Sequence, residues 1–161
     1  MANINPIGII ISSGADGNFI GGQYGVEGND ISRSTNEGIY IEASDGTVVQ
    51  GNTIGNDGSA ANSNNVGIRI DSGNNTFIGG DNPSGTSNTY NVISGNDDDG
   101  IRLDDALNTQ IYGNFIGVDV TGTAGLPNGT SGIVILGTSN GTQVGSNSSD
   151  NANTIASNPL Y

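Results

Sequence analysis

Residues 91–119 read NVISGNDDDGIRLDDALNTQIYGNFIGVD, and this stretch decides the fold. It contains a Gly-Ile-x-Leu element at residues 100–103, a second apolar position at Ile111 and a third at Ile116. The first element recurs in similar form at five glycines spaced 30, 29, 33 and 32 residues apart: Gly8, Gly38, Gly67, Gly100 and Gly132. Recurrence at such a period indicates a repeat protein in which similar coils stack on one another.

Each repeat carries three short strands. The second apolar position recurs at Ile20, Val49, Ile78, Ile111 and Val144, and the third at Ile31, Ile54, Ile93, Ile116 and Ile155. Their separations alternate between long and short, which indicates a coil of about 22 residues with an excursion of about ten residues at alternate corners. Odd coils extend after the second strand, as in residues 79–89, and even coils after the third, as in residues 117–131. A helical alternative fails because Gly and Asn interrupt every candidate window.

Alternation with a period of two assigns the strand faces. The predicted core has three stacked columns: Ile39, Ile41, Val49, Ile54, Ile68, Ile70, Ile78, Ile93, Ile101, Leu103, Ile111, Ile116, Ile133, Ile135, Val144 and Ile155. Four threonines share the inward side of the second strand and predict an internal hydroxyl ladder: Thr47, Thr76, Thr109 and Thr142. Corners such as Gly51-Asn52 and Gly113-Asn114 are expected to be left-handed, which Gly and Asn tolerate.

These patterns predict an all-β protein, a right-handed parallel β-helix (β-solenoid) of about five coils with three short strands per coil, in a single domain over residues 1–161. The stretches 91–96, 100–103 and 108–119 resemble the parallel β-helix repeats of the pectate-lyase-like superfamily, especially the Asn-x-Ile-x-Gly and Gly-Ile-x-Ile repeats of large bacterial secreted and surface proteins. The resemblance covers nearly the whole chain and implies an extracellular or cell-surface protein. It leaves function open, because enzymes, adhesins and tail fibres share this fold.

Composition excludes several function classes. The chain has 28 Gly among 161 residues, no His and no Cys, and a net charge of −13 from 16 acids and three cations. An acidic surface repels phosphate backbones and anionic lipids, so neither nucleic acid nor a membrane is an expected partner. No stretch approaches the ~20 apolar residues of a membrane span. The opening residues lack the basic and apolar regions of a signal peptide.

Catalysis is the first candidate function, since the resemblance implies polysaccharide lyases, hydrolases and epimerases. Asp104-Asp105 beside Arg102 resembles the paired acids of polygalacturonases, but no His or Lys accompanies them. Arg69 and Arg102 occupy equivalent outward positions, where a lyase would place a proton-abstracting base. A surface of charge −13 would repel polyuronates, so the arginines are expected to balance neighbouring acids. We therefore predict a protein that is not an enzyme, with no catalytic or cofactor-binding residue.

Calcium is the second candidate. Glu42, Asp71 and Asp104 follow the first strand at equivalent positions in three successive coils, and carboxylates are calcium ligands. The glycine-rich calcium-roll motif is absent, so a solvated acidic edge is the default expectation and calcium the alternative. Ice binding is excluded because the outward column of the second strand is not threonine: it reads Phe19, Val48, Phe77, Gln110 and Gln143.

Two functional hypotheses remain. The first is a structural fibre or filament subunit that stacks on itself head to tail, because neither end shows an obvious cap. Its assembly interface would contain Ile9, Ile11, Ile155, Leu160 and Tyr161. In odd coils the next first strand begins eight residues after the third-strand Ile, a point just beyond Tyr161. The second hypothesis is a carbohydrate-binding or polysaccharide-processing module from a larger secreted protein.

Overall fold

A computed structural model describes residues 5–22, 27–56, 61–80, 89–146 and 152–159 of the chain. These residues form fifteen short strands and no helix, so none of their segments is a membrane-spanning helix. The strands pair into three parallel sheets of five strands each. The chain passes from sheet to sheet in turn, with three strands in each coil, and makes about four full turns between its first coil and its last. The all-β solenoid prediction is therefore confirmed.

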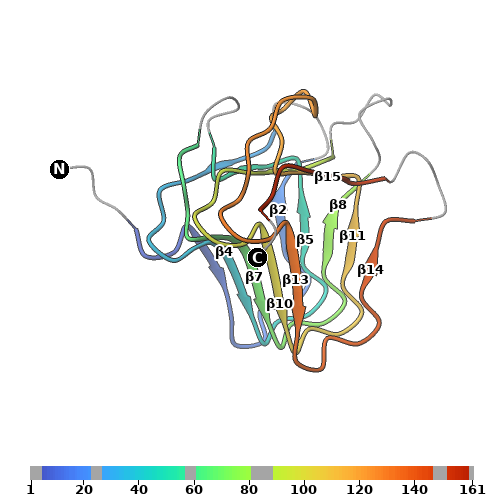
Figure 1. Ribbon diagram of the computed structural model, residues 1–161. Helices are drawn as coiled ribbons and strands as arrows, with labels where there is room; N and C mark the ends of the chain where they lie inside the picture. Colours follow the sequence, from blue (N-terminus) through green and yellow to red (C-terminus); the bar gives the residue numbers. More distant parts are fainter. Residues whose placement is uncertain (1–4, 23–26, 57–60, 81–88, 147–151, 160–161) are drawn as a thin grey trace.

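The strands fall where the sequence repeat places them. Sheet A consists of β1 (Ile9–Ile11), β4 (Glu37–Glu42), β7 (Val66–Asp71), β10 (Ile101–Asp104) and β13 (Ile133–Leu136). Sheet B consists of β2 (Phe19–Gly21), β5 (Val48–Gln50), β8 (Phe77–Gly79), β11 (Gln110–Tyr112) and β14 (Gln143–Val144). Sheet C consists of β3 (Asp30–Ile31), β6 (Thr53–Ile54), β9 (Val92–Ile93), β12 (Phe115–Ile116) and β15 (Thr154–Ile155). Figure 1 shows the strands of sheets A and B following one another in chain order, from blue to red.

The register aligns like residues from coil to coil. Ile101 pairs with Ile68 on one side and Ile133 on the other, and Ile111 pairs with Ile78 and Val144. Twelve of the sixteen predicted core side chains are completely buried: Ile39, Ile41, Val49, Ile54, Ile68, Ile70, Ile78, Ile93, Ile101, Leu103, Ile111 and Ile116. Stacking thus builds three continuous apolar columns, as predicted.

The core prediction is wrong for the last coil. Ile135, Val144 and Ile155 are 45%, 44% and 45% exposed, and Ile133 is only partly buried. Their strands, β13, β14 and β15, are the last of the three sheets. Side chains of the inner coils are covered by the coils above and below them, whereas no described coil follows these three strands.

The threonines point inward but form no hydroxyl ladder. Thr47, Thr76 and Thr109 are completely buried, yet their hydroxyl oxygens have no hydrogen-bond partner. Neighbouring strands lie about 4.8 Å apart, which is too far for one hydroxyl to reach the next. Thr142, in the last coil, is partly buried and donates to the carbonyl of Ser139 at 3.2 Å.

Gly and Asn have different roles at the corners of the coils. Gly51 and Gly113 have φ values of 71° and 58°, a left-handed conformation that favours glycine. Asn52 and Asn114 do not adopt positive φ, so that expectation is wrong for them. The glycine makes the turn, and the following asparagine places its side chain inside the solenoid.

The excursions of the even coils are as predicted. Residues 117–131 close on themselves through an antiparallel bridge between Val118 and Gly125. The second coil has an equivalent bridge between Asn56 and Ala61. Of the predicted excursion at 79–89, residues 81–88 lie outside the described part of the chain.

Candidate functional site

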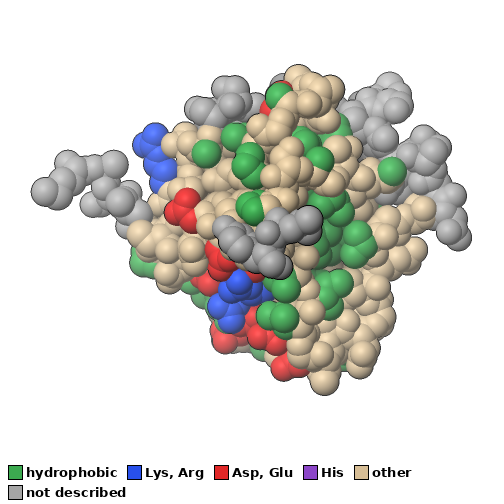
Figure 2. Space-filling model, in the orientation of Figure 1, with side chains coloured by type: hydrophobic (Ala, Val, Ile, Leu, Met, Phe, Trp, Pro, Cys, Tyr) green, Lys and Arg blue, Asp and Glu red, His purple; other side chains and the backbone are tan. Residues whose placement is uncertain are grey.

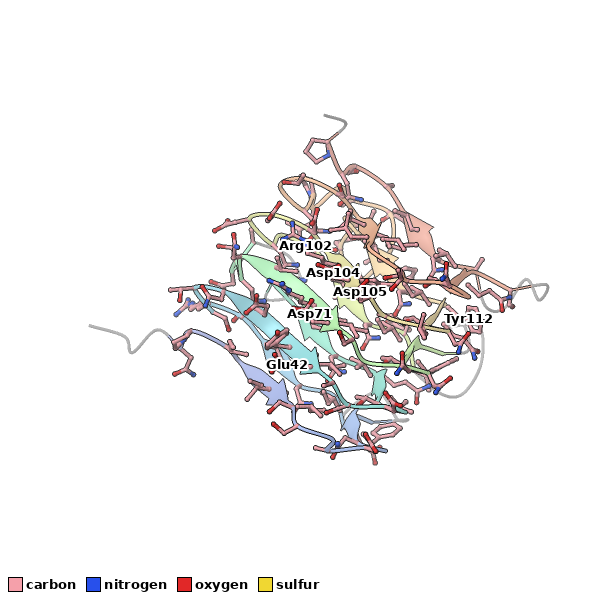
Figure 3. All side chains as sticks on the ribbon, turned by 90° about the horizontal axis from the view of Figure 1, so that it is seen from below. Glu42, Asp71, Arg102, Asp104, Asp105 and Tyr112 are labelled. Atoms are coloured by element: carbon pink, nitrogen blue, oxygen red, sulfur yellow. The ribbon has the colours of Figure 1, made fainter. Side chains whose placement is uncertain are left out.

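The outer face of sheet A carries the charged residues that the sequence singles out. Strand register places Tyr40, Arg69 and Arg102 in one outward column. Two residues further along the same strands lies the acidic column, which consists of Glu42, Asp71 and Asp104. Figure 3 shows the acidic residues on neighbouring strands, with Arg102 near Asp104. Both predicted alignments are thus present.

Arg69 is held by three neighbours. Its guanidinium lies 2.8 Å from the carboxylate of Asp71 and 3.6 Å from that of Glu37. It also lies over the ring of Tyr40, 5.7 Å from the centroid. The hydrogen bond to Asp71 raises the pKa of Arg69 above its ordinary value. This arginine remains a cation at any physiological pH.

Arg102 is paired in the same way. Its Nε donates to Asp99 at 2.8 Å and its Nη2 to Asp98 at 2.9 Å. Partial burial lowers the pKa of Arg102, but the hydrogen bonds and charges of Asp99 and Asp98 outweigh that effect and raise it. A guanidinium held in its protonated form cannot accept a proton. The geometry therefore favours charge balance over the proton abstraction that a lyase needs.

Asp105, the second residue of the Asp104-Asp105 pair, is bound by a residue of the next coil. The carboxylate of Asp105 accepts hydrogen bonds from the backbone N–H and the hydroxyl of Thr138, at 2.7 and 2.8 Å. These bonds to Thr138 lower the pKa of Asp105. Glycoside hydrolysis needs one protonated and one ionised carboxyl group, and the lowered pKa of Asp105 suits it only for the ionised role. Its role in the structure is to bridge two coils at a corner.

The acidic column does not gather into a metal site. Asp71 is bonded to Arg69 and also accepts a hydrogen bond from the Tyr40 hydroxyl at 3.0 Å. Among the described residues, no group of three or more carboxylates is close enough to hold a metal ion. Glu42, Asp71 and Asp104 therefore follow one another along the sheet without converging on one point.

Two ladders of asparagine side chains are the feature that sequence reasoning missed. The first runs along the corner between sheets B and C and joins Asn29, Asn52, Asn91, Asn114 and Asn153. In each step the Nδ2 of one residue donates to the Oδ1 of the next, at 2.9 to 3.1 Å. The backbone N–H groups of Asn29, Asn52, Asn91 and Asn114 donate to the same oxygens.

A second ladder runs along the corner between sheets C and A. Asn64 donates to Asn96, Asn96 to Asn128 and Asn128 to Asn158, at 2.8 to 3.1 Å. Ser34 begins this series, because its backbone N–H donates to Asn64 Oδ1 at 3.0 Å. The sequence signal for the first ladder was an asparagine exactly two residues before each third-strand isoleucine. Both ladders satisfy polar groups that the tight corners bury.

The two ends of the solenoid differ. At the C-terminal end the exposed side chains line a hollow of about 700 Å³, formed by Ile133, Ile135, Val144, Ile155 and Asn158 among others. Figure 2 shows hydrophobic side chains on this end, between β13 and β14 in the view.

At the N-terminal end the columns begin with Ile11, Ile20 and Ile31, each less than a tenth exposed, while Ile9 is partly buried. Of the predicted assembly residues, Ile155 is therefore in an open apolar face and Ile11 is covered. Leu160 and Tyr161 lie outside the described residues.

Comparisons with known proteins add no further assignment. No protein-family model matches this chain, and no curated protein or solved structure matches it significantly. Function must therefore be argued from the geometry of the chain itself.

Proposed function

We propose that this chain is a structural β-solenoid, without catalytic activity, that assembles with further copies of itself by stacking coil on coil. The observation that carries the proposal is the open C-terminal face, where Ile135, Val144 and Ile155 are nearly half exposed. In the inner coils the equivalent Leu103 and Ile111 are completely buried. One more coil of the same kind would cover this face.

The free energies of burial and association show what a joint, meaning the contact between two stacked copies, requires. Burying the exposed half of three aliphatic side chains contributes roughly 1 kcal/mol each. Association costs about 4–15 kcal/mol in lost translational and rotational freedom. Apolar contact alone is therefore too weak, and the outer edges of β13, β14 and β15, which pair with no described strand, must also find partners. A joint that continues all three sheets meets both requirements.

The charged face supports a role without catalysis. Arg69 and Arg102 are held protonated by acids, and Asp105 is held ionised by Thr138. General acid–base catalysis needs a group that exchanges a proton near the working pH. We expect no turnover of acidic polysaccharides, which a product assay with purified protein would check. Turnover that Arg102→Ala or Asp104→Ala abolishes would contradict this.

Assembly itself is tested by sedimentation over a concentration series and by negative-stain electron microscopy. We expect oligomers that grow with protein concentration, and fibres with an axial repeat near five coil heights, about 24 Å. A strictly monomeric profile at every concentration would contradict the proposal.

A relationship to the pectate-lyase-like superfamily and an extracellular or cell-surface location belong to the same proposal. They are supported by the three-strand coil and by the repeat sequences within it. Carbohydrate binding is the second candidate function, favoured by the outward aromatic residues of sheet B. Phe19 is 49% exposed, and Phe77 packs edge-on against Tyr112 at 5.5 Å. A melting temperature that rises with added oligosaccharide, in a protein that stays monomeric, would favour this candidate.

A further inference from the structure

We infer that the proposed stacking has one direction: the C-terminal face of one copy receives the N-terminal face of the next, and Asn153 of the first donates to Asn29 of the second. This inference rests on the proposed function, since it names the joint through which copies would stack. It follows from the polarity of the asparagine ladders, which is the same in every coil.

Asparagines inside the first ladder have hydrogen-bond partners on both sides. Asn114 Oδ1 accepts from the N–H and the Nδ2 of Asn91, while its own N–H and Nδ2 donate to Asn153. Its Nδ2 also donates to the carbonyl of Ile78 in the coil before. At each step of this ladder, the backbone N–H and the Nδ2 of an asparagine donate toward the C-terminal end, and its Oδ1 accepts from the N-terminal side.

The ladder ends are complementary for the same reason. Asn153 donates one Nδ2 hydrogen to the carbonyl of Ile111 at 2.8 Å, and no coil among the described residues lies beyond it to receive the other. At the opposite end, Asn29 donates to Asn52, and within the described part of the chain no preceding coil donates to its Oδ1. A head-to-tail joint would bring the donors of Asn153 to the acceptor of Asn29 and continue the ladder without a break.

The competing joint is tail to tail. Two C-terminal faces would cover each other's exposed Ile135, Val144 and Ile155, which by apolar area alone is the better match. A second C-terminal face presents ladder donors and not the acceptor that Asn29 presents, so the donors of Asn153 would find no ladder acceptor there. Leaving buried donors without acceptors costs free energy, and this offsets what the added contact between apolar side chains contributes. Polarity therefore decides the direction.

Two similar corners meet in the head-to-tail joint. Asn158-Pro159 continues the second ladder beyond Asn128, at the corner that leads from sheet C into a further sheet A strand. Asn5-Pro6 occupies the same type of corner before β1, because Thr35 donates to Asn5 as Asn65 donates to Ser34. In the head-to-tail joint, Asn158-Pro159 of one copy and Asn5-Pro6 of the next would occupy the same corner of the same coil, so one of the two segments must be displaced. A chain that begins at Gly8 lacks the Asn5-Pro6 corner and is therefore expected to assemble faster at equal concentration. Slower assembly would count against a joint in which these two corners overlap.

Disulfide trapping tests the direction, because the chain has no cysteine of its own. Phe19 and Gln143 are both exposed and end the same outward column of sheet B, through Val48, Phe77 and Gln110. In a head-to-tail joint Gln143 of one copy would lie about 4.8 Å from Phe19 of the next, within the range that a disulfide spans.

We expect a mixture of Phe19→Cys and Gln143→Cys proteins to form a mixed disulfide, which intact mass distinguishes from either homodimer. Gln110→Cys replaces Gln143→Cys in the matched control, where an exposed position of an inner coil should give little mixed product. Adding Asn29→Ala to the Phe19→Cys protein should lower the yield, whereas Asn18→Ala, in the same coil but outside the ladder, should not.

The outcomes separate the two proposals. Oligomers by sedimentation, with mainly Gln143→Cys homodimers or with no preference for the mixed product, would overturn the direction and leave self-assembly intact. Absence of both oligomers and disulfides would overturn both. A mixed product that Asn29→Ala lowers and Asn18→Ala leaves unchanged supports the head-to-tail joint through the ladder.

Discussion

Ile116 and Ile155 occupy the same column of sheet C, one coil apart, and pair directly with each other. The first is completely buried and the second 45% exposed. The same contrast separates Leu103 from Ile135 in sheet A and Ile111 from Val144 in sheet B. At the C-terminal end of the solenoid, the burial of an inward apolar residue therefore depends on a following coil. The first coil differs, because Ile11, Ile20 and Ile31 are buried although a described coil lies on one side of them only.

The largest expected effect compares this pair directly. Ile116→Ala leaves a cavity between two covering coils and should lower the free energy of unfolding by about 2–5 kcal/mol. Ile155→Ala removes a half-exposed side chain and should lower it by about 1 kcal/mol or less. Urea unfolding of both variants at a concentration where the protein is monomeric checks the contrast. Equal losses would mean that the last coil is covered after all.

The same pair sharpens the assembly proposal. If copies stack through this face, Ile155 gains a covering coil only in the oligomer. Ile155→Ala should then weaken self-association, while its effect on the monomer stays small. Sedimentation of the two alanine variants at matched folded concentration measures this, and unchanged association of Ile155→Ala would argue against the C-terminal face as the joint.

The asparagine ladder gives the next contrast. Asn114→Ala deprives the buried N–H and Nδ2 of Asn91 of their acceptor and removes the donor to the carbonyl of Ile78. We expect a loss of about 2–4 kcal/mol, since each buried group left without a partner costs about 1–3 kcal/mol. Asn29→Ala affects only an exposed ladder end and should cost about 1 kcal/mol or less. Similar values for the two would show that the ladder adds no stability inside the stack.

These contrasts also separate what the sequence could predict from what it could not. The spacing of the Gly-Ile-x-Ile elements was sufficient to predict the strands, their register and the inward columns. The repeat period and the alternation of apolar and polar residues can both be read from the sequence itself. The exposure of Ile135, Val144 and Ile155 was missed because their sequence is like that of the inner repeats. The inner repeats are covered by a following coil, and no described coil follows the last repeat. This difference depends on how the coils stack and not on the local sequence.

The candidate site shows a similar limit. The alignment of Arg69 with Arg102 followed from the repeat, and so did the acidic column. The ladders were missed although the asparagines recur at a fixed offset, because Asn at a tight corner has two roles. It can adopt the left-handed backbone or place its amide inward, and only the structure shows that glycine takes the first role at Gly51 and Gly113.

A smaller effect is expected from the inward threonines. The buried hydroxyl of Thr109 has no hydrogen-bond partner, so Thr109→Val exchanges an unsatisfied polar group for a methyl group of similar size. This should raise the free energy of unfolding by about 1 kcal/mol. Thr142→Val in the last coil removes a hydroxyl that is bonded to Ser139 and should not raise it. If Thr109→Val destabilises the protein, a buried water between the coils is the explanation to examine crystallographically.

The smallest expected effect lies on the outer face of the inner coils, where Tyr40 has neighbours that its equivalents at the two ends lack. Its column continues as Ile10 in β1 and Val134 in β13, and neither of those side chains titrates. Burial raises the pKa of Tyr40 to about 12, with further contributions from the hydrogen bond to Asp71 and from its charge. The phenol of an unfolded chain has a pKa near 10.

The sign of the pH dependence follows from these two values. Between about pH 10 and 12 the folded protein keeps the Tyr40 proton while the unfolded chain releases it, so the unfolded state binds fewer protons and stability falls as pH rises. The contribution is fully present below about pH 10 and is lost as pH rises through the folded value. Tyr40→Phe should therefore lose less stability than the parent protein between pH 10 and 12, with little pH-dependent difference between them from pH 7 to 9. Urea unfolding of both proteins across this range measures the effect, and parallel losses above pH 10 would show that Asp71 and burial do not hold the phenol in its neutral form.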